Sequence, residues 1–430
     1  MPKPDGVVEP TVRLTSGGAI LGSLDPLDTT MASGFVAIAP HAFDTALREN
    51  CDIPGLVSFV SRLRRVANIR PDGASTMSNG YQNFSADATA NVQTLPRLLA
   101  RYRDPSLHRS LTEIAITVAP LIALWAAMWA LLHVSYWLSL MLAIPAAGFL
   151  VRLFMIQHDC SHGSFFRNRL INDWVGRVIG VATLTPYDYW KRTHAAHHAS
   201  SGNLDRRGMG DVSTMTVREY LALNWRGRLF YRLYRHPAVM FGLGPAYLFL
   251  LQHRAPFGLM RAGWRPWIST MATNAGIALV AAGLMWLIGV GPFLLIHLPI
   301  AVLSASIGVW LFYVQHQFEG TVWEHEPIWS HPEAALHGSS HYDLPLVLRW
   351  FTANIGVHHV HHLNSRIPYY RLGEVLRNHP ELSGVGRLTL WQSLRCIRFA
   401  LWDESASRLV SFGALRKRKK AERAMTELAA

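Results

Sequence analysis

Cysteine is scarce in this sequence, and the cysteine patterns that serve cofactors are missing. The 430 residues include only three cysteines, Cys51, Cys160 and Cys396, which are odd in number and widely spaced. No C-x-x-C, C-x-x-C-H or iron–sulfur run occurs, which argues against a c-type haem and against a thiolate-ligated cluster. We expect the three thiols to be reduced and of minor structural importance.

Other patterns that would name a function are also absent. There is no H-E-x-x-H, which argues against a zinc protease, and no E-x-x-H, which excludes a carboxylate-bridged di-iron bundle. Residues 31–40 are weakly apolar, but they lack a basic start and a clear cleavage site, so they do not form a convincing signal peptide.

Apolar residues, in contrast, are abundant: they make up 50% of the chain and gather in long runs. Each run is about 20 residues long, enough for a helix of roughly 30 Å to cross the hydrocarbon layer of a membrane. We therefore predict an all-α integral membrane protein with four transmembrane helices. Their predicted ranges are Ile114–Leu132, Tyr136–Ile156, Ile268–Ile288 and Pro292–Val314.

The connections between these runs predict how they are arranged. Very short connectors join the first run to the second and the third to the fourth, so we predict two helical hairpins. Pro145 and Pro299 lie inside the runs and are expected to kink the helices, which membrane helices tolerate. Two further apolar stretches, Val175–Pro186 and Pro237–Gln252, are short for a span, and we predict that they are interfacial or re-entrant.

The formal charge of +13 lies in segments that flank the apolar runs, which fits a membrane face with anionic lipid better than a nucleic-acid partner. The two short connectors carry no Lys or Arg, so the positive-inside rule predicts that both termini and the middle region are cytoplasmic. Arg152, one turn from the predicted end of its helix, is expected to snorkel to the same side. The basic residues outside the hairpins include Arg97, Arg101, Arg103, Arg109, Lys191, Arg192, Arg206, Arg207, Arg218, Arg226, Arg228, Arg232, Arg235, Arg416, Lys417, Arg418, Lys419 and Lys420.

Histidines gather in four clusters with ligand-like spacing. On a helix, H-x-x-x-H and H-x-x-H-H each place their imidazoles on one face, whereas His359 is turned about 100° away from that face. A single H-x-x-H-H is also compatible with chance, a solvated surface or adventitious metal binding. The nine candidates are His158, His162, His194, His197, His198, His316, His358, His361 and His362.

Topology tests this grouping independently. His158 directly follows the second predicted span and His316 directly follows the fourth, so two hairpins return the chain to the same side each time. All nine histidines then lie on the cytoplasmic face. If Pro237–Gln252 crossed the membrane, His316 and the last cluster would lie on the opposite side from the first five.

Nine imidazoles exceed the ligands of one metal ion, because a structural zinc takes four ligands and a catalytic zinc three plus water. Two ions are therefore expected, but imidazole suits iron, copper and zinc alike, so the ligand type leaves the metal open. Asp159, Asp188 and Glu319 are candidates for acceptors that fix the imidazole tautomers, or they are ordinary surface carboxylates. Cys160 is interpreted as a small buried filler.

The stretches "HDCSHGSF", "THAAHH", "FYVQHQFE" and "NIGVHHVHHLNSRIPYYRL" resemble the membrane fatty acid desaturases, over roughly residues 95–400. They look most like the bacterial delta-12 (omega-6) acyl-lipid branch, since three residues separate the histidines of the first box. One difference is Phe312, which stands where the delta-9 type has an asparagine that binds metal through water.

The resemblance implies four membrane helices with a cytoplasmic helical cap, in a bacterial inner membrane. It also implies that the nine histidines bind two non-haem iron ions, with O2 as co-substrate. The expected reaction places a cis double bond in the acyl chain of a membrane lipid. Because the sequence has no flavin, haem or iron–sulfur motif, electrons are expected from a separate donor, such as ferredoxin with its reductase.

The sequence also predicts a division of the chain into three segments. Residues 1–95 are predicted to be a poorly ordered extension, in which Met31 or Met77 is a possible alternative start. Residues 96–415 are predicted to form the desaturase domain, and residues 416–430 a basic tail.

Two alternative functions remain open. A hydroxylase or ketolase of the same superfamily, acting on alkanes, lipids or carotenoids, would share the same histidines. A metal transporter is disfavoured, because its ligands would lie within the spans near the midplane.

Overall fold

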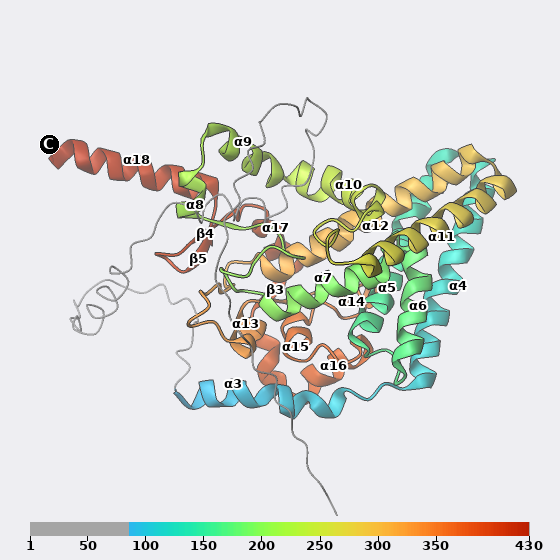
Figure 1. The fold of residues 1–430 in the computed structure, drawn as a ribbon, viewed down its shortest axis with the longest axis horizontal. Coiled ribbons are helices and arrows are strands. Elements are labelled where there is room, and N and C mark those ends of the chain that lie inside the picture. Colours follow the sequence, from blue (N-terminus) through green and yellow to red (C-terminus); the bar gives the residue numbers. More distant parts are fainter. Residues whose placement is uncertain (1–85, 430) are drawn as a thin grey trace, which may run out of the picture. The chain divides into compact units, whose positions relative to one another are not determined.

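A computed structural model describes residues 86–429 of the chain (Figure 1). Residues 86–95 of the predicted extension belong to a helix, α3 (Ala86–Leu98). The remainder of that extension, with Cys51, Met31 and Met77, lies outside the described residues. The other two cysteines, Cys160 and Cys396, are buried free thiols, as expected.

Four long apolar helices are present at the predicted positions, and each is long and apolar enough to cross a membrane. They are α4 (Leu107–Leu132), α5 (Tyr136–His162), α11 (Trp264–Ile288) and α12 (Val290–His316). Both α5 and α12 continue through their internal prolines and past the predicted ends. Gly163, at a φ of 65°, ends α5 in the left-handed conformation that glycine adopts without steric cost.

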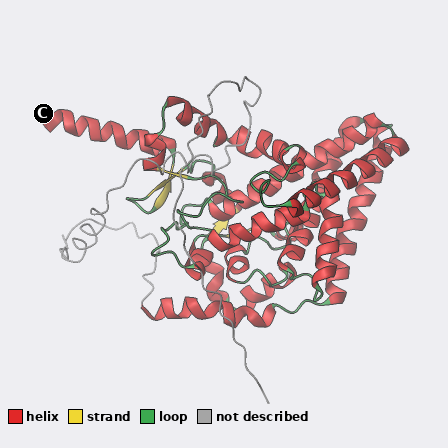
Figure 2. Cartoon of the chain, viewed as in Figure 1, coloured by secondary structure: helices red, strands yellow, loops and turns green. Residues whose placement is uncertain are grey.

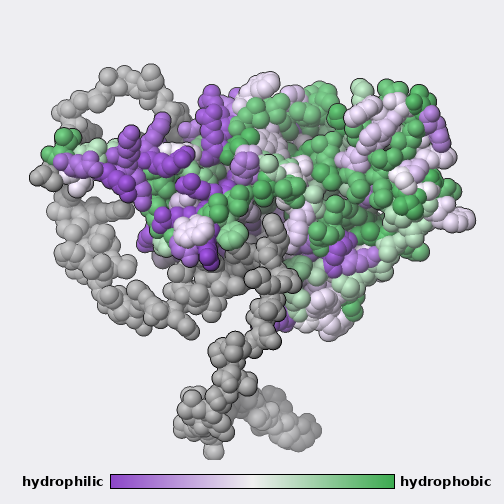
Figure 3. Space-filling model, turned by 90° about the horizontal axis from the view of Figure 1, so that it is seen from above, coloured by the Kyte–Doolittle hydropathy of each residue, from purple (hydrophilic) through white to green (hydrophobic). Residues whose placement is uncertain are grey.

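Helix α5 is the inner one of the four: 56% of its most apolar stretch is buried, against 6% for α11. It packs against both α4 and α12, while α11 packs along α12 and α7. Hydrophobic side chains cover much of the half of the surface that these long helices form, whereas hydrophilic side chains gather around α18 (Figure 3). The exposed apolar surface of the long helices is what contact with lipid requires.

The other described helices are shorter than these four, and α18 projects away from them (Figure 1). The predicted interfacial stretches lie in α6 and in η2–α10, and neither is a candidate span. The α-helices are α6 (Arg169–Ala182), α7 (Tyr187–Ser200), α8 (Val217–Ala222), α9 (Trp225–Tyr234), α10 (Gly244–Leu250), α13 (His331–His337), α14 (Leu346–Phe351), α15 (His358–Leu363), α16 (Tyr369–Asn378), α17 (Leu390–Cys396) and α18 (Phe412–Ala429). The 3-10 helices are η1 (Leu99–Tyr102), η3 (Gln252–Arg254) and η4 (Pro380–Gly384), and η2 (Val239–Leu243) is a π-helix.

The fold is mostly helical rather than wholly so, because short strands form two small sheets (Figure 2). One sheet has the order β1-β4-β5, with β1 parallel to β4 and β4 antiparallel to β5. In the other, β2 lies parallel to β3. The strands are β1 (Met215–Thr216), β2 (His341–Asp343), β3 (Arg387–Thr389), β4 (Leu401–Asp403) and β5 (Arg408–Val410).

Strand β2 positions the segment that leads into α15. The amide of Tyr342 donates to the carbonyl of Gly356 at 2.7 Å, and Ser340 accepts from the amide of His358 at 3.2 Å. The largest apolar core joins the last turns of α5 to α15 and α16 through residues such as Ile156, Val360 and Leu372. These contacts bring the end of α5 and the start of α15 together, although about 200 residues separate them in the chain.

Candidate metal centre

The nine predicted histidines converge from four helices. His158 and His162 occupy the last turns of α5, and His316 is the last residue of α12. Helix α7 carries the cluster that begins at His194, and α15 begins at His358. Both long helices therefore extend beyond their predicted spans just far enough to present histidines at their ends.

The structure divides the nine histidines into two groups of ligand-type nitrogens, and within each group these atoms lie within 4.8 Å of one another. The five-histidine group contains His158, His162, His194, His198 and His361. The four-histidine group contains His197, His316, His358 and His362.

Each H-x-x-H-H motif is split between the groups, in opposite ways. On α7 the pair at i and i+4, His194 and His198, enters the five-histidine group, and His197 enters the other. On α15 the pair at i and i+4, His358 and His362, enters the four-histidine group, and His361 crosses to the first. The predicted three imidazoles of each motif therefore do not all enter the same group. Two of them belong to one group and the third belongs to the other.

In each group four Nε2 atoms form a close chain. In the five-histidine group the Nε2 of His194 lies 3.1 Å from that of His162 and 3.2 Å from that of His198. In the four-histidine group the Nε2 of His316 lies 3.1 Å from that of His197 and 3.0 Å from that of His358. Adjacent ligands of one metal ion, at bond lengths of about 2.1 Å and right angles, lie about 3 Å apart. The spacing fits ligands of a shared ion.

Three of the nine rings are held through their other nitrogen, Nδ1. The Nδ1 of His158 lies 3.2 Å from Oδ1 of Asp159, and that of His197 lies 2.5 Å from Oδ1 of Asp211. The Nδ1 of His316 donates to the carbonyl of Gly338 at 3.1 Å. Such contacts fix the tautomer in which Nε2 carries the free lone pair, which is the usual arrangement of metal-binding histidines.

The predicted carboxylates have different positions. Asp159 contacts His158 and also accepts the amide of Tyr369 at 2.7 Å, as an orienting acceptor should. Asp188 instead forms an ion pair with Arg177, and Glu319 is an exposed side chain. Sequence reasoning missed Asp211, because this residue has no ligand-like spacing to its partner, His197, and the contact depends on the loop after α7.

Burial favours the neutral form of most imidazoles outside the long helices. For five of them the pKa lies well below the ordinary value of 6.5, first because burial disfavours the imidazolium and second because neighbouring imidazoles repel its charge. These are His194, His198, His358, His361 and His362. A neutral ring is the form that binds a metal ion, so the donor set fits two ions with imidazole ligands.

His359 differs from its neighbours, as the helical period predicts. It is fully buried, but its Nε2 lies 3.0 Å from the carbonyl oxygen of Leu382, and it belongs to neither group. This residue therefore serves the packing of α15 against η4.

Aromatic side chains border both groups. Trp190 stacks on His194, with centroids 4.5 Å apart and planes at 14°, and Phe154 meets Trp190 edge-on at 5.1 Å. Phe312 packs against His197 at 5.0 Å and His316 at 5.4 Å. Each aromatic residue lies one turn before a histidine of its own helix, on α7, α5 and α12 respectively, so apolar rings adjoin the nitrogen groups.

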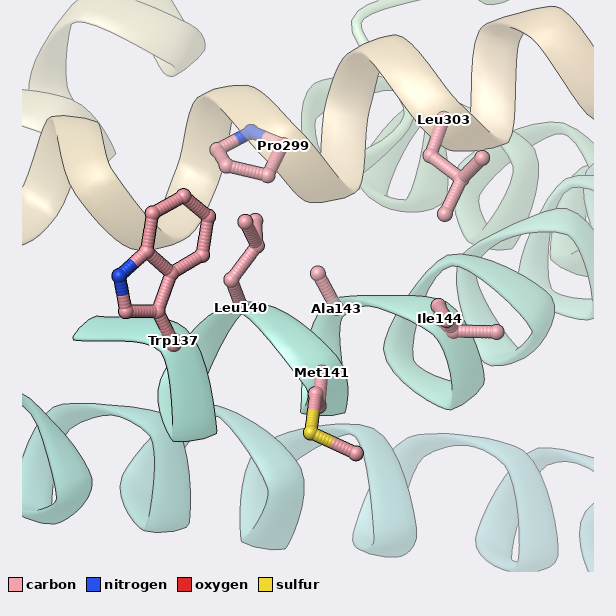
Figure 4. A pocket seen from close by; sticks show the side chains of 7 residues that line it. All are labelled: Trp137, Leu140, Met141, Ala143, Ile144, Pro299 and Leu303. Atoms are coloured by element: carbon pink, nitrogen blue, oxygen red, sulfur yellow. The ribbon is translucent and has the colours of Figure 1, made fainter. Parts of the chain in front are cut away.

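An apolar cavity of about 500 Å³ lies elsewhere, between α5 and α12 (Figure 4). Its lining includes Trp137, Met141 and Pro299 and none of the nine histidines. Ile144, on its wall, precedes His158 by fourteen residues, which is about 21 Å along a helix. The cavity is thus remote from the nitrogen groups.

A model of the fatty acid desaturase family matches residues 135–393, a stretch that contains all nine histidines. The chain belongs to this family. It is 45% identical over 322 residues to a fatty acid desaturase of Bacillus subtilis (strain 168). The aligned stretch covers 75% of the chain and 91% of that desaturase. As a fatty acid desaturase, the protein is an oxidoreductase of lipid metabolism.

More distant relatives are acyl-lipid desaturases with named specificities. An sn-1 acyl-lipid omega-3 desaturase (ferredoxin) of Synechocystis sp. is 29% identical over 283 residues, covering 63% of the chain and 74% of that desaturase. An sn-1 oleoyl-lipid 12-desaturase of the same organism is 29% identical over 224 residues, covering 51% of the chain and 62% of the relative.

Proposed function

We propose that this desaturase introduces a cis double bond, of the delta-12 (omega-6) type, into the acyl chain of a membrane lipid. In this proposal the nine histidines of the two groups bind two iron ions, and O2 is the co-substrate. The observation that carries the proposal is the pair of buried imidazole groups at the ends of two membrane-length helices. Oxygen chemistry at these groups would lie within reach of an acyl chain in the bilayer.

Each turnover converts –CH2–CH2– to –CH=CH– and, with two electrons and two protons from outside, reduces one O2 to two waters. The two iron ions with O2 supply the oxidising power to remove hydrogen from an unactivated methylene, which no side chain provides. Burial in the chain keeps the imidazoles of α15 and those of His194 and His198 neutral, and Asp159, Asp211 and the carbonyl of Gly338 orient three other rings.

The aromatic residues are proposed to seat the acyl chain. Trp190 and Phe312 contact histidines of different groups, so a methylene chain lying against both rings would pass beside both groups. Apolar rings also exclude water from the site. The group that then faces the oxidising centre is a C–C bond of the acyl chain. Which bond is presented then depends on where these rings hold the chain.

The proposed membrane arrangement follows from charge and connection lengths. Helices α4 and α5 form one hairpin and α11 and α12 the other, with their short connectors on the side away from the cytoplasm. The histidine groups then belong to a cytoplasmic cap at the inner membrane of a bacterium, where acyl chains arrive from the lipid and electrons from the aqueous side.

The electron donor is proposed to be a small soluble carrier such as ferredoxin, supplied by its reductase. The name of one relative, the omega-3 desaturase of Synechocystis sp., includes ferredoxin. The exposed basic residues of α18, among them Arg416, Lys417 and Lys420, offer charge complementarity to an acidic carrier.

The test is expression in a host whose lipids contain only saturated and monounsaturated acyl chains, with fatty acid profiling by mass spectrometry. The delta-12 proposal predicts a diene with the new cis bond at carbon 12 of an 18-carbon chain. A bond at the omega-3 position or at carbon 9 would retain the reaction and overturn the position. A hydroxylated or oxo product would favour a hydroxylase or ketolase and overturn the reaction.

A further inference from the structure

A buried ion pair lies among the helices, away from the two histidine groups. Arg152 of α5 donates to Oε2 of Glu113 of α4, and their side chains are only 3% and 1% exposed. A second Arg152 N–H group donates to the carbonyl of Trp350, whose ring lies 4.1 Å from the guanidinium. The prediction that Arg152 snorkels to the surface is therefore wrong, since α5 continues ten residues past it and its buried guanidinium pairs with the buried carboxylate of Glu113.

Tyr369 connects this ion pair to the five-histidine group. Its hydroxyl donates to Oε2 of Glu113 at 3.1 Å, and its backbone N–H donates to Oδ2 of Asp159 at 2.7 Å. The other carboxylate oxygen of Asp159 lies 3.2 Å from Nδ1 of His158. A continuous set of polar contacts thus runs from Glu113 through Tyr369 and Asp159 to a ring of the nitrogen group.

Stability alone does not explain a buried pair of this kind. Desolvating two charges costs several kcal/mol per ion, and replacing such a pair by well-packed apolar residues is often neutral or stabilising. What the pair supplies is orientation. Arg152 donates to the carbonyl of Trp350 of α14 and to Oε2 of Glu113 of α4, and this same Oε2 accepts the hydroxyl of Tyr369. Arg109, whose side chain is 55% exposed, pairs with the remaining oxygen of Glu113 at 2.7 Å and completes this arrangement.

We propose that the Glu113–Arg152 pair is a positioning device for the five-histidine group, and that it acts through Tyr369 and Asp159 on the ring of His158. The inference rests on the proposed function, because it takes that group to be a metal site. The pair holds the phenol of Tyr369, the amide of Tyr369 holds Asp159, and Asp159 sets the tautomer and angle of the imidazole. Glu113 and Tyr369 are positioning residues; neither contacts the metal site directly.

The test uses the full-length protein in detergent, stripped of metal and titrated with Co²⁺ alone, because the visible absorption of bound Co²⁺ reports its ligand geometry. Tyr369→Phe removes one oxygen and leaves the backbone N–H in place. Glu113→Gln removes the charge from the pair. Loss of an orienting contact typically lowers metal affinity by about 10–100-fold, so the more remote Tyr369→Phe is expected to weaken Co²⁺ binding by up to about 10-fold and to shift the absorption bands.

A double variant and a matched control separate positioning from general stability. Glu113→Gln combined with Tyr369→Phe should weaken binding no more than the more severe single variant, since both substitutions act through the same contact between the Tyr369 hydroxyl and residue 113. The control is Thr117→Val. Thr117 is buried one turn along α4 from Glu113, and its hydroxyl donates to the backbone carbonyl of Glu113 in the same helix. This control should leave the affinity and the absorption bands unchanged.

The outcomes are distinguishable. Wild-type affinity and unchanged bands in Tyr369→Phe and Glu113→Gln, even with lower melting temperatures, would overturn the inference and leave the proposed function intact. If Glu113→Gln does not fold, Tyr369→Phe decides by the same readout. A wild-type protein that binds no Co²⁺ would overturn the proposed metal site and the inference with it.

Discussion

The rings of His198 and His362 stack face to face, with centroids 4.1 Å apart and planes 13° apart. His198 belongs to the five-histidine group and His362 to the four-histidine group. The two groups are therefore neighbours that share a ring-to-ring boundary, rather than separate sites on the same surface. A substitution in either group should affect the other through this boundary.

Replacing His361 tests the ligand assignment most directly. His361→Ala removes one nitrogen from the five-histidine group, so it should abolish the desaturated product and lower bound iron, measured by fatty acid profiling and elemental analysis of the purified protein. The matched control is His359→Gln on the same helix, which keeps a donor for the carbonyl of Leu382 and should retain iron. Full activity with normal iron in His361→Ala would remove this residue from the ligand set.

Asp211 gives a second test, because it orients His197 without belonging to either group. Asp211→Asn weakens the acceptor for Nδ1 of His197 and should reduce metal affinity or activity by about 10–100-fold. Asp188→Asn is the comparison, since Asp188 pairs with Arg177 and should be replaceable with little change in metal content. Equal metal affinity in both variants would contradict an orienting role for Asp211.

Phe312 should influence where the double bond forms. Phe312→Ala opens space beside His197 and His316, so the acyl chain should shift and the product should include double bonds at more than one position. The positions can be measured by mass spectrometry of derivatised acyl chains. The control is Phe241→Ala, because Phe241 of η2 packs against Trp310 and Tyr313 of α12 rather than against the histidines. This variant should preserve a single position of the double bond even if its stability falls. A single unchanged position in Phe312→Ala would exclude this ring from setting the site of reaction.

Gly356 should not tolerate a side chain. A Cβ at this position would lie 2.3 Å from the carbonyl oxygen of Tyr342, in the contact that positions α15. Gly356→Ala should therefore destabilise the protein by about 1–3 kcal/mol, as overpacking does, and lower its melting temperature in detergent. Gly308→Ala in α12 has open space around its Cβ and should be neutral or slightly stabilising. A melting temperature for Gly356→Ala equal to that of Gly308→Ala would contradict the close contact.

His325 should make one surface contact dependent on pH. Hydrogen bonds to Asp205 and then to Glu404 raise its pKa above 6.5, despite the opposing effect of partial burial. Because the folded-state pKa is raised, the stabilisation is fully present below about 6.5 and is lost as the pH rises through the folded value. Amide exchange near residues 404–407, corrected for intrinsic pH effects, should therefore accelerate as the pH rises through this range. In His325→Gln this extra dependence should disappear; if it persists, His325 is not its cause.

The four long helices could be predicted because their length and apolar composition are local properties. Their ends could not, since the polar stretch from His158 to His162 interrupts the apolar run while the helix continues to the cap at Gly163. That nine histidines come together could also be predicted, eight from their spacing and His316 from its place directly after the fourth apolar run. The assignment of His197 to the four-histidine group and of His361 to the five-histidine group could not be predicted. It depends on how α7 and α15 face each other.

Long-range polar contacts were the hardest to predict. Glu113 and Arg152 lie on different helices, and nothing in either local sequence distinguishes a buried pair from a snorkelling arginine. The pairing of Asp211 with His197 depends on a loop, and the parallel pairing of β2 with β3 joins segments 46 residues apart. Each contact is set by tertiary packing, which helical periodicity and charge counts do not encode.

Helix α15 has a consequence for the order of events during synthesis, because it lies downstream of all four long helices. The ribosome has produced every membrane-length helix before it makes His358. A nascent chain that ends at residue 357 has four members of the five-histidine group but only two of the four-histidine group. Both histidine groups are therefore complete only after translation has passed residue 362, when all four long helices have already been synthesised.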